Sequence, residues 1–209
     1  MTKEAYYDAL AQRHGTDVQK RFEMATVAIA GLGGLGSNIA ICLARAGIGK
    51  LILIDDDRVD LTNLHRQQYK VSQVGRYKTD ALRENLMEMN PFIEVETYCI
   101  RMTRDNLASL LQGADIICEA FDDAKEKAML VNGVLEHLPS RYLIAASGMA
   151  GDGSANAIIT QKRGGRFYLC GDGISDVNSS GALLSSRVMV CAAHEAHMVL
   201  RILIGHEIP

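Results

Sequence analysis

Short apolar runs alternate with amphipathic segments over most of the chain. The apolar runs predict five buried strands, at residues 26–30, 50–55, 94–100, 114–119 and 141–146. Between them apolar residues recur at helical spacing, which predicts helices at 36–47, 75–90, 103–112 and 123–138. Strands that alternate with helices predict a parallel sheet with helices on both faces. We therefore expect an α/β fold with a doubly wound, mostly parallel sheet of the Rossmann type.

The two ends of the chain differ from the middle in their pattern of apolar and polar residues. Residues 3–24 predict one or two amphipathic helices that break near His14-Gly15. After Gly148 glycine becomes frequent, and hairpin-like segments at 153–160 and 166–170 predict a small β extension. An apolar stretch from residue 182 to 204 predicts a C-terminal packing helix. We expect one domain over 1–209, made of N-terminal helices (1–25), a nucleotide-binding core (26–147), and the extension with its closing helix (148–209).

The charge balance argues against nucleic acid or an anionic membrane as a partner. The formal net charge is −3 over 209 residues, so the chain has no basic excess. The first 23 residues mix both signs and lack an apolar core, so we expect no signal peptide. No stretch reaches the ~18 apolar residues of a membrane span. A cytoplasmic protein is the expectation.

The five cysteines are scattered along the chain. Cys42 and Cys118 lie inside apolar runs, so we expect buried free thiols in a reducing compartment. No two cysteines have the CxxC spacing that is typical of structural zinc sites. Zinc is therefore not expected.

The first strand runs directly into a glycine-rich turn that opens a helix. Its candidate ligand-binding residues are Gly31, Gly33, Gly34, Gly36 and Ser37. Glycines let the backbone turn tightly and approach a phosphate, which then binds free N–H groups at the positive helix end. The pattern alone also occurs in proteins without a ligand. Its position between a strand and a helix favours nucleotide binding.

Acidic, amide and basic residues follow the next strand. We expect Asp55 to accept a ribose hydroxyl, with Asp57 as a second polar contact, although a solvated strand end is the alternative. Arg66 and Lys78 would be ordinary surface cations elsewhere, but here they lie close to a phosphate turn and to two neutral donors, Asn63 and Gln67. Arginine offers a planar fork and lysine a point charge, so together they can hold two phosphates.

Asp122 follows the fourth predicted strand. In doubly wound sheets ligands lie at the carboxyl ends of the strands, so this carboxylate should face the same crevice. One carboxylate together with nucleotide phosphates is a common Mg²⁺ site. Capping of the following helix is the alternative role.

The spaced combination GLGGLGS, Asp55-x-Asp57, Asn63-Leu64-x-Arg66-Gln67 and Lys78 resembles the adenylating family that includes ThiF, MoeB and the ubiquitin-activating enzymes. The resemblance covers residues 26 to about 147 and is most similar to short bacterial ThiF-type proteins. It implies a glycine turn around the nucleotide, Asp55 at the ribose, phosphate contacts from the Asn63–Lys78 group, and Asp122 near Mg²⁺. It also implies that Arg13 reaches the active site of a partner subunit in a homodimer.

The resemblance further implies an ATP-dependent adenylyltransferase that acts on a small ubiquitin-like sulfur carrier ending in glycine. The carrier expected is similar to ThiS of thiamine biosynthesis, and Cys170 is the candidate for any sulfur transfer. Four alternatives stay open: activation of a MoaD-like carrier, activation of a carboxylate on modified tRNA, an NAD-binding oxidoreductase, and a non-catalytic nucleotide-binding scaffold of the same fold. The closing helix is apolar on more than one side, which independently favours a two-fold contact.

Overall fold

One sheet organises the molecule. The computed structural model describes residues 1–177 and 181–209, and within them seven strands follow the order β3-β2-β1-β4-β5-β7-β6. Neighbouring strands are parallel except β6 and β7, which are antiparallel. The strands are β1 (Thr26–Ala30), β2 (Lys50–Ile54), β3 (Glu94–Tyr98), β4 (Ile116–Glu119), β5 (Tyr142–Ala146), β6 (Ile159–Gly164) and β7 (Phe167–Gly171). The expected mostly parallel α/β fold is confirmed.

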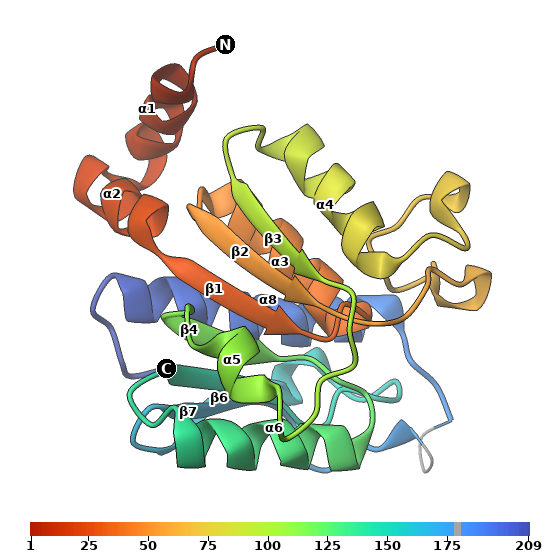
Figure 1. The fold of residues 1–209 in the computed structure, drawn as a ribbon. Coiled ribbons are helices and arrows are strands. Elements are labelled where there is room, and N and C mark those ends of the chain that lie inside the picture. Colours follow the sequence, from red (N-terminus) through yellow and green to blue (C-terminus); the bar gives the residue numbers. More distant parts are fainter. Residues whose placement is uncertain (178–180) are drawn as a thin grey trace.

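Helices cover both faces of this sheet (Figure 1). One face carries α3 (Gly34–Ala46), α4 (Lys78–Met89) and α8 (Ser185–Leu203), and the other carries α5 (Leu107–Leu111) and α6 (Ala124–His137). The strands feed two separate cores because successive side chains alternate between the faces. Val27 and Ile29 of β1 belong to the core under α3 and α8, whereas Ala28 and Ala30 belong to the core under α5 and α6.

The N-terminal segment forms two helices, as predicted. The helices are α1 (Lys3–His14) and α2 (Thr16–Met24). The break lies at Gly15, whose φ of 97° is a left-handed conformation that glycine adopts without strain. Helix α1 projects from the body beyond the sheet (Figure 1). Tyr7 is its buried residue, and the ring packs among aromatic neighbours that include Phe92.

The predicted β extension is part of the main sheet, and its first strand begins later than expected. Residues 155–157 form a 3₁₀ turn, η3 (Ala155–Ala157), because the Ser154 hydroxyl accepts the Asn156 N–H at 3.2 Å. The predicted strand at 153–160 is therefore wrong, and the true hairpin partner is β6. Its turn is set by Gly165, which has a φ of 42°. Strand β7 then pairs in parallel with β5.

Two other expectations need correction. Cys42 is exposed on α3, because the buried residues of that helix, such as Ile39 and Leu43, lie on its other side. The helix predicted at 103–112 is shortened to α5, because the Asn106 side chain accepts the Thr103 N–H at 2.7 Å and donates to the Arg101 carbonyl at 3.0 Å. These bonds hold residues 101–106 as a loop.

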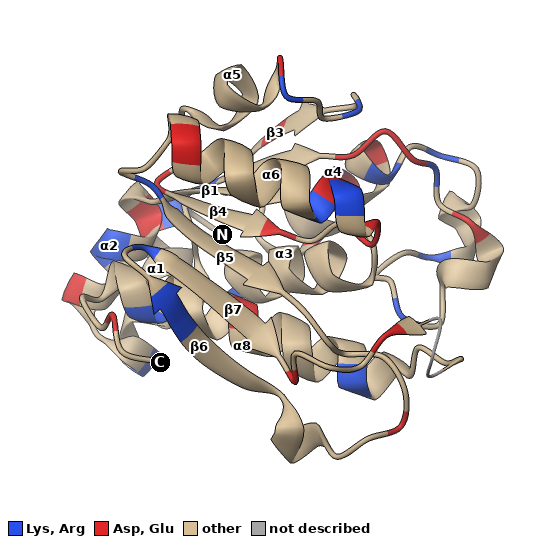
Figure 2. Ribbon diagram, turned by 90° about the horizontal axis from the view of Figure 1, so that it is seen from below, with Lys and Arg blue, Asp and Glu red and all other residues tan. Residues whose placement is uncertain are grey.

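The surface shows no sign of a membrane-spanning element among the described residues. Over residues 1–177 and 181–209, no helix is both long enough and apolar enough to cross a bilayer. Figure 2 shows lysine and arginine positions interspersed with acidic ones on the helices and loops around the sheet. Such a mixed distribution agrees with the small net charge of −3.

Candidate nucleotide-binding site

The candidate site lies at the carboxyl edge of the sheet, beside strand β1. The chain leaves β1 toward β2 and β3 on one side, and β4 later pairs on the other side of β1. This change of direction opens a crevice at the ends of the strands, which is where doubly wound folds bind ligands. Gly31 follows β1, Asp55 follows β2, and Asp122 follows β4.

The glycine turn is shaped by close backbone contacts. Gly31 has a φ of 89°, and a Cβ atom there would lie 2.7 Å from the Ala120 carbonyl oxygen. A Cβ atom on Gly36 would lie 1.8 Å from the Gly31 carbonyl oxygen, so no side chain fits at either position. Gly33 is the N-cap residue of helix α3, and no side chain caps that end of the helix. The first backbone N–H groups of α3 are thus arranged to receive an anion.

Asp55 ties the end of β2 to the glycine turn. One carboxylate oxygen accepts the Leu32 N–H at 2.6 Å, and the other accepts the Asp57 N–H at 2.8 Å. Burial raises the pKa of Asp55, although the nearby Lys78 ammonium and these two backbone donors oppose the shift. The predicted ribose ligand therefore also has a structural role, because both of its oxygens already accept backbone bonds.

Asp57 and Lys78 form an ion pair across the mouth of the site. Lys78 begins helix α4, and its Nζ atom lies 2.7 Å from an Asp57 oxygen and 3.6 Å from an Asp55 oxygen. The Asp57 side chain is 70% exposed, whereas that of Lys78 is only 7% exposed. Within the described ranges, one cluster of three acidic side chains brings its carboxylate oxygens within 4.8 Å of one another, and its members are Asp55, Asp56 and Asp57. Lys78 already supplies positive charge to this group.

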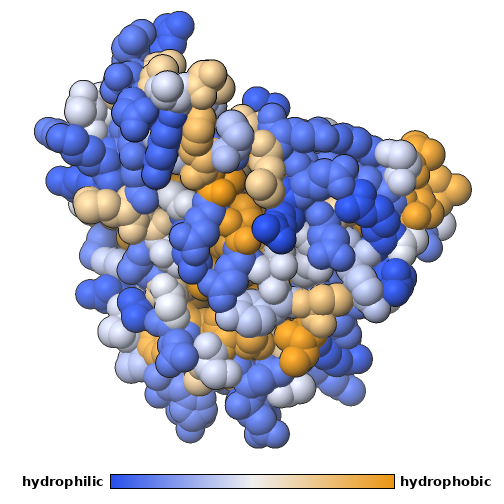
Figure 3. All heavy atoms as spheres, turned by 45° about the horizontal axis from the view of Figure 1, so that its top comes forward, coloured by the Kyte–Doolittle hydropathy of each residue, from blue (hydrophilic) through white to orange (hydrophobic). Residues whose placement is uncertain are grey.

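The loop with Asn63, Arg66 and Gln67 is docked onto the glycine turn. The Asn38 side chain donates to the Arg66 carbonyl at 3.0 Å, and the Tyr69 hydroxyl donates to the Leu32 carbonyl at 2.7 Å. Asn38 and Tyr69 were not predicted from the sequence, although a polar Asn38 inside an apolar helix was a usable signal. Figure 3 shows an apolar patch at the edge of the molecule formed by this loop, where Leu61, Val71 and Val74 are exposed.

Ser37 acts inside the protein rather than at its surface. It is fully buried, and its hydroxyl donates to the Gly33 carbonyl at 2.6 Å and accepts the Gln68 N–H at 3.1 Å. The structure therefore places this predicted ligand residue as a link between the glycine turn and the loop after it. Its hydroxyl has no remaining donor for a nucleotide.

Arg66 and Gln67 present free polar groups beside the glycine turn. The Arg66 Cγ atom lies 3.3 Å from the Cβ position of Gly34, and its guanidinium makes no hydrogen bond or ion pair with any described residue. Gln67 is buried, its Nε2 atom lies 3.7 Å from the Cβ position of Gly33, and its Oε1 has no partner among the described residues. The Asn63 side chain is half-buried on the same loop. These groups are available to phosphate oxygens and hydroxyls.

The two acidic residues that follow β4 have different surroundings in the structure. Asp123 caps α6 by accepting the Lys125 and Glu126 N–H groups at 2.8 and 3.0 Å. Asp122 is exposed and has no hydrogen-bond partner in the described part of the chain. Lys127 fixes the segment by donating to the Glu119 carboxylate and, at 2.8 Å, to the Phe121 carbonyl. The capping role thus belongs to Asp123, and Asp122 faces solvent.

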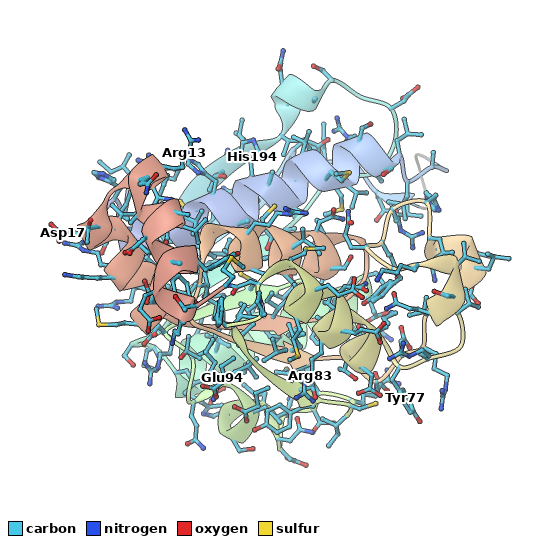
Figure 4. The ribbon with its side chains drawn as sticks, turned by 90° about the horizontal axis from the view of Figure 1, so that it is seen from above. Arg13, Asp17, Tyr77, Arg83, Glu94 and His194 are labelled. Carbon is cyan, nitrogen blue, oxygen red and sulfur yellow. The ribbon has the colours of Figure 1, made fainter. Side chains whose placement is uncertain are left out.

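Arg13 and Cys170 lie apart from this crevice. Arg13 is exposed near the end of α1, and Figure 4 shows it on the opposite side of the molecule from Tyr77, the neighbour of Lys78. Cys170 is fully buried, and burial raises the pKa of its thiol far above the ordinary range. A protonated, inaccessible thiol does not fit sulfur transfer.

Comparisons with known proteins agree with this geometry. The sequence pattern of the ThiF family matches residues 7–209. The adenylyltransferase and sulfurtransferase MOCS3 of Culex quinquefasciatus is 30% identical over 201 residues, which are 92% of this chain and 45% of the relative. The sulfur carrier protein adenylyltransferase of Thermus thermophilus is 33% identical over 131 residues, which are 62% of this chain and 43% of the relative. The chain thus spans less than half the length of these curated relatives.

Solved structures show the same fold. The tRNA N6-threonylcarbamoyladenosine dehydratase of E. coli in complex with ATP has a TM-score of 0.85 and 22% identity, and the match covers 96% of this chain and 94% of that one. At this identity the likeness shows the fold alone. The family match over almost the whole length, together with the glycine turn and the residues docked around it, establishes that the chain belongs to the ThiF family.

Proposed function

We propose that the chain is an ATP-dependent adenylyltransferase that activates the C-terminal glycine carboxylate of a small ubiquitin-like sulfur carrier. Family membership supports the reaction class, and relatives are named sulfur carrier protein adenylyltransferase and adenylyltransferase and sulfurtransferase. The observation that carries the proposal is a pair of cations around the glycine turn: the Arg66 Cγ atom lies 3.3 Å from the Cβ position of Gly34, and the Lys78 Nζ atom lies 3.6 Å from Asp55, whose carboxylate bonds that turn. A carrier of the ThiS type in thiamine biosynthesis is the specific candidate.

The proposed chemistry needs no nucleophilic side chain. A carrier carboxylate oxygen attacks the α-phosphorus, a P–O bond forms, the bond from that phosphorus to the bridging oxygen breaks, and pyrophosphate leaves with the electron pair. The protein must align the reactants and stabilise charge that moves onto the leaving group. Arg66, whose guanidinium has no partner among the described residues, and Lys78 would supply this stabilisation. Asp55 and Asp57 would receive the ribose.

Asp122 fits a Mg²⁺ role on its own chemistry. Its carboxylate is exposed at the carboxyl edge of the sheet and has no partner in the described ranges, whereas Asp123 next to it is committed to the helix. Magnesium bound there would neutralise phosphate charge. Asn63 and Gln67 would contribute neutral donors to the same phosphates.

The alternatives differ in what they bind. A MoaD-like carrier would use the same site with another partner, and a carboxylate on modified tRNA would replace the protein tail. The net charge of −3 gives the tRNA alternative little electrostatic support. An oxidoreductase would bind NAD in preference to ATP. Comparing the affinities for ATP and NAD by calorimetric titration separates that last alternative from the others.

The decisive experiment is ATP–pyrophosphate exchange in the presence of glycine-tailed carriers. We expect exchange only with a carrier present, and we expect Arg66→Ala and Lys78→Ala each to lower it ~10²-fold or more, because each removes charge stabilisation. Lys70→Ala is the matched control, since Lys70 pairs with the exposed Glu88 at 2.6 Å on the outer part of α4. Near-normal exchange in both site variants, or an equal loss in the control, would contradict the proposed roles.

We also propose a homodimer in which Arg13 completes the partner's site. Arg13 is exposed on a projecting helix and lies on the far side of its own chain from Lys78's neighbour Tyr77, so it cannot serve that site within one chain (Figures 1 and 4). The apolar sides of α8, which the sequence assigned to a two-fold contact, pack largely within the chain, and Met189 is the large apolar side chain of this helix that stays exposed, at 45%. Sedimentation at micromolar concentration would detect the dimer, and a monomer there would contradict it.

A further inference from the structure

A buried arginine near the start of α8 holds two loops together. Arg187 is 4% exposed, and its guanidinium donates to the carbonyls of Ala150 at 3.2 Å, Gly153 at 2.5 Å and Ser154 at 2.6 Å. It also donates to an Asp172 oxygen at 2.5 Å. One planar side chain thereby connects the loop after β5 with the loop after β7.

Asp172 organises the second of these loops. Its other carboxylate oxygen accepts the N–H groups of Ile174 and Ser175 at 2.9 and 2.8 Å. Burial alone would raise the pKa of Asp172, but bonds from Ser175 and Ile174 and the charge of Arg187 outweigh it and lower that pKa to about 2. The ion pair is therefore intact over the whole neutral range, and both partners are almost fully buried.

These loops stand at the same edge of the sheet as the glycine turn. Strands β5 and β7 run parallel to β4, so Ser147 and Asp172 follow strand ends that continue the row formed by β1 and β4. The loop after β5 is bonded to the segment before α8, because the Gly151 N–H donates to the Ala182 carbonyl at 2.9 Å. Arg187 thus lies between the loops that follow β5 and β7, at the carboxyl edge of the sheet.

The same segment also touches the phosphate loops. His65 precedes Arg66 in the sequence, and its Nε2 atom lies 3.2 Å from the Leu183 carbonyl oxygen. Val188, which follows Arg187, has its Cγ1 atom 3.0 Å from the Cβ position of Gly34. The segment 182–188, to which the loop after β5 is bonded, therefore contacts both the start of α3 and the Arg66 loop.

We propose that Arg187 is a positioning residue that fixes the loops 148–154 and 172–175 as the wall along which the carrier's C-terminal tail reaches the nucleotide. This inference rests on the proposed adenylyltransferase function. A glycine tail has no side chains, so a protein recognises it through backbone groups whose positions are already fixed. The two loops have glycines at 148, 151, 153 and 173, so they would move freely without a clamp.

The test separates binding of the carrier from binding of ATP. We expect Arg187→Met to raise the carrier concentration needed for half-maximal exchange about tenfold, on the order of 1.4 kcal/mol, while the ATP dissociation constant stays within about twofold of the parent's. Arg187→Lys should recover little, because an ammonium cannot replace a planar fork that donates to both loops at once. Arg201→Met is the matched control, since Arg201 lies on the same helix and its guanidinium donates, within the described part of the chain, to the exposed Ile208 carbonyl.

Amide hydrogen exchange gives a readout that does not depend on activity. We expect Arg187→Met and Asp172→Asn to increase the rate of amide hydrogen exchange in both 148–154 and 172–175. The amide hydrogen exchange of the glycine turn should stay unchanged. Loss of ATP affinity in proportion to the carrier effect, or unchanged protection in the two loops, would overturn the positioning role. Asp172→Asn supplies the answer if Arg187→Met does not fold. If the parent chain itself shows no carrier-dependent exchange, the proposed function fails, while hydrogen exchange still decides whether Arg187 holds the loops.

Discussion

Replacing Glu195 by glutamine should stabilise the protein, and increasingly so as the pH rises. Glu195 lies on α8 and is fully buried, and neither carboxylate oxygen has a hydrogen-bond partner among the described residues. Burial, with a further contribution from the Glu119 carboxyl, raises the pKa of Glu195 well above its ordinary value, and the Lys127 ammonium opposes this only in part. Lys127 is already bonded to Glu119 and to the Phe121 carbonyl.

The sign of the effect follows from proton linkage. The unfolded chain releases the Glu195 proton near pH 4.5, whereas the folded chain keeps it to higher pH. Between these two pKa values the folded state loses about 1.4 kcal/mol of stability for each pH unit. Glutamine does not titrate, so its own unpaired amide costs the same at every pH. Above pH 5 the advantage of Glu195→Gln over the parent should therefore grow by about 1.4 kcal/mol for each pH unit, until the pH reaches the raised pKa of Glu195 in the folded chain.

Urea unfolding followed by circular dichroism at pH 5, 6 and 7 measures this difference. Glu207→Gln is the matched control, because bonds from Lys162 and Tyr142 lower the pKa of Glu207 in the folded chain, so this carboxyl is ionised in both the folded and the unfolded chain above pH 5. The stability difference between that variant and the parent should therefore stay nearly constant from pH 5 to pH 7. A stability difference between Glu195→Gln and the parent that does not change with pH would refute the reasoning.

Other expected outcomes test the site and its assembly. Gly36→Ala should abolish ATP binding or folding, because the new methyl group would lie 1.8 Å from the Gly31 carbonyl oxygen, and calorimetry with circular dichroism checks both. Mixing Arg13→Ala chains with Arg66→Ala chains should restore part of the exchange, and no recovery in verified heterodimers would count against a shared site. Cys170→Ser should leave exchange within about twofold, since that thiol is buried. Metal analysis of protein purified without added metal should find no stoichiometric zinc.

The fold was largely predictable because its signals are local. Apolar runs and the strand–glycine–helix succession specify a parallel sheet, and alternation along β1 sends Val27 and Ala28 to opposite cores. The first hairpin strand was misplaced because the Ser154 hydroxyl accepts the Asn156 N–H and backbone bonds from Ala157 and Ile158 complete a 3₁₀ turn, and apolar periodicity does not record such bonds. Cys42 was misjudged because an apolar neighbourhood in sequence does not decide which side of a helix faces the sheet.

The site was predictable in its residue types but not in their bonding. The spacing of glycines, acids and cations identified the crevice, yet nothing in the spacing shows that Ser37 and Asp55 bind backbone groups. Those bonds depend on how loops pack after folding. Arg187 was missed although an arginine among the apolar residues at the start of this helix was visible in the sequence. Its role depends on the folded chain, in which the carbonyl groups of Gly153 and Ser154, more than 30 positions away, accept bonds from its guanidinium.

The ion pair between Lys78 and Asp57 has a consequence for ligand selectivity. In the free protein the Lys78 ammonium has the Asp57 carboxylate as a partner at 2.7 Å, so a lone phosphate that binds this ammonium competes with Asp57. A nucleotide that offers a phosphate to the lysine and sugar hydroxyls to the aspartate would give both residues a partner. If these residues contact the nucleotide as proposed, we expect the site to favour molecules that carry both groups over inorganic phosphate and unphosphorylated nucleosides.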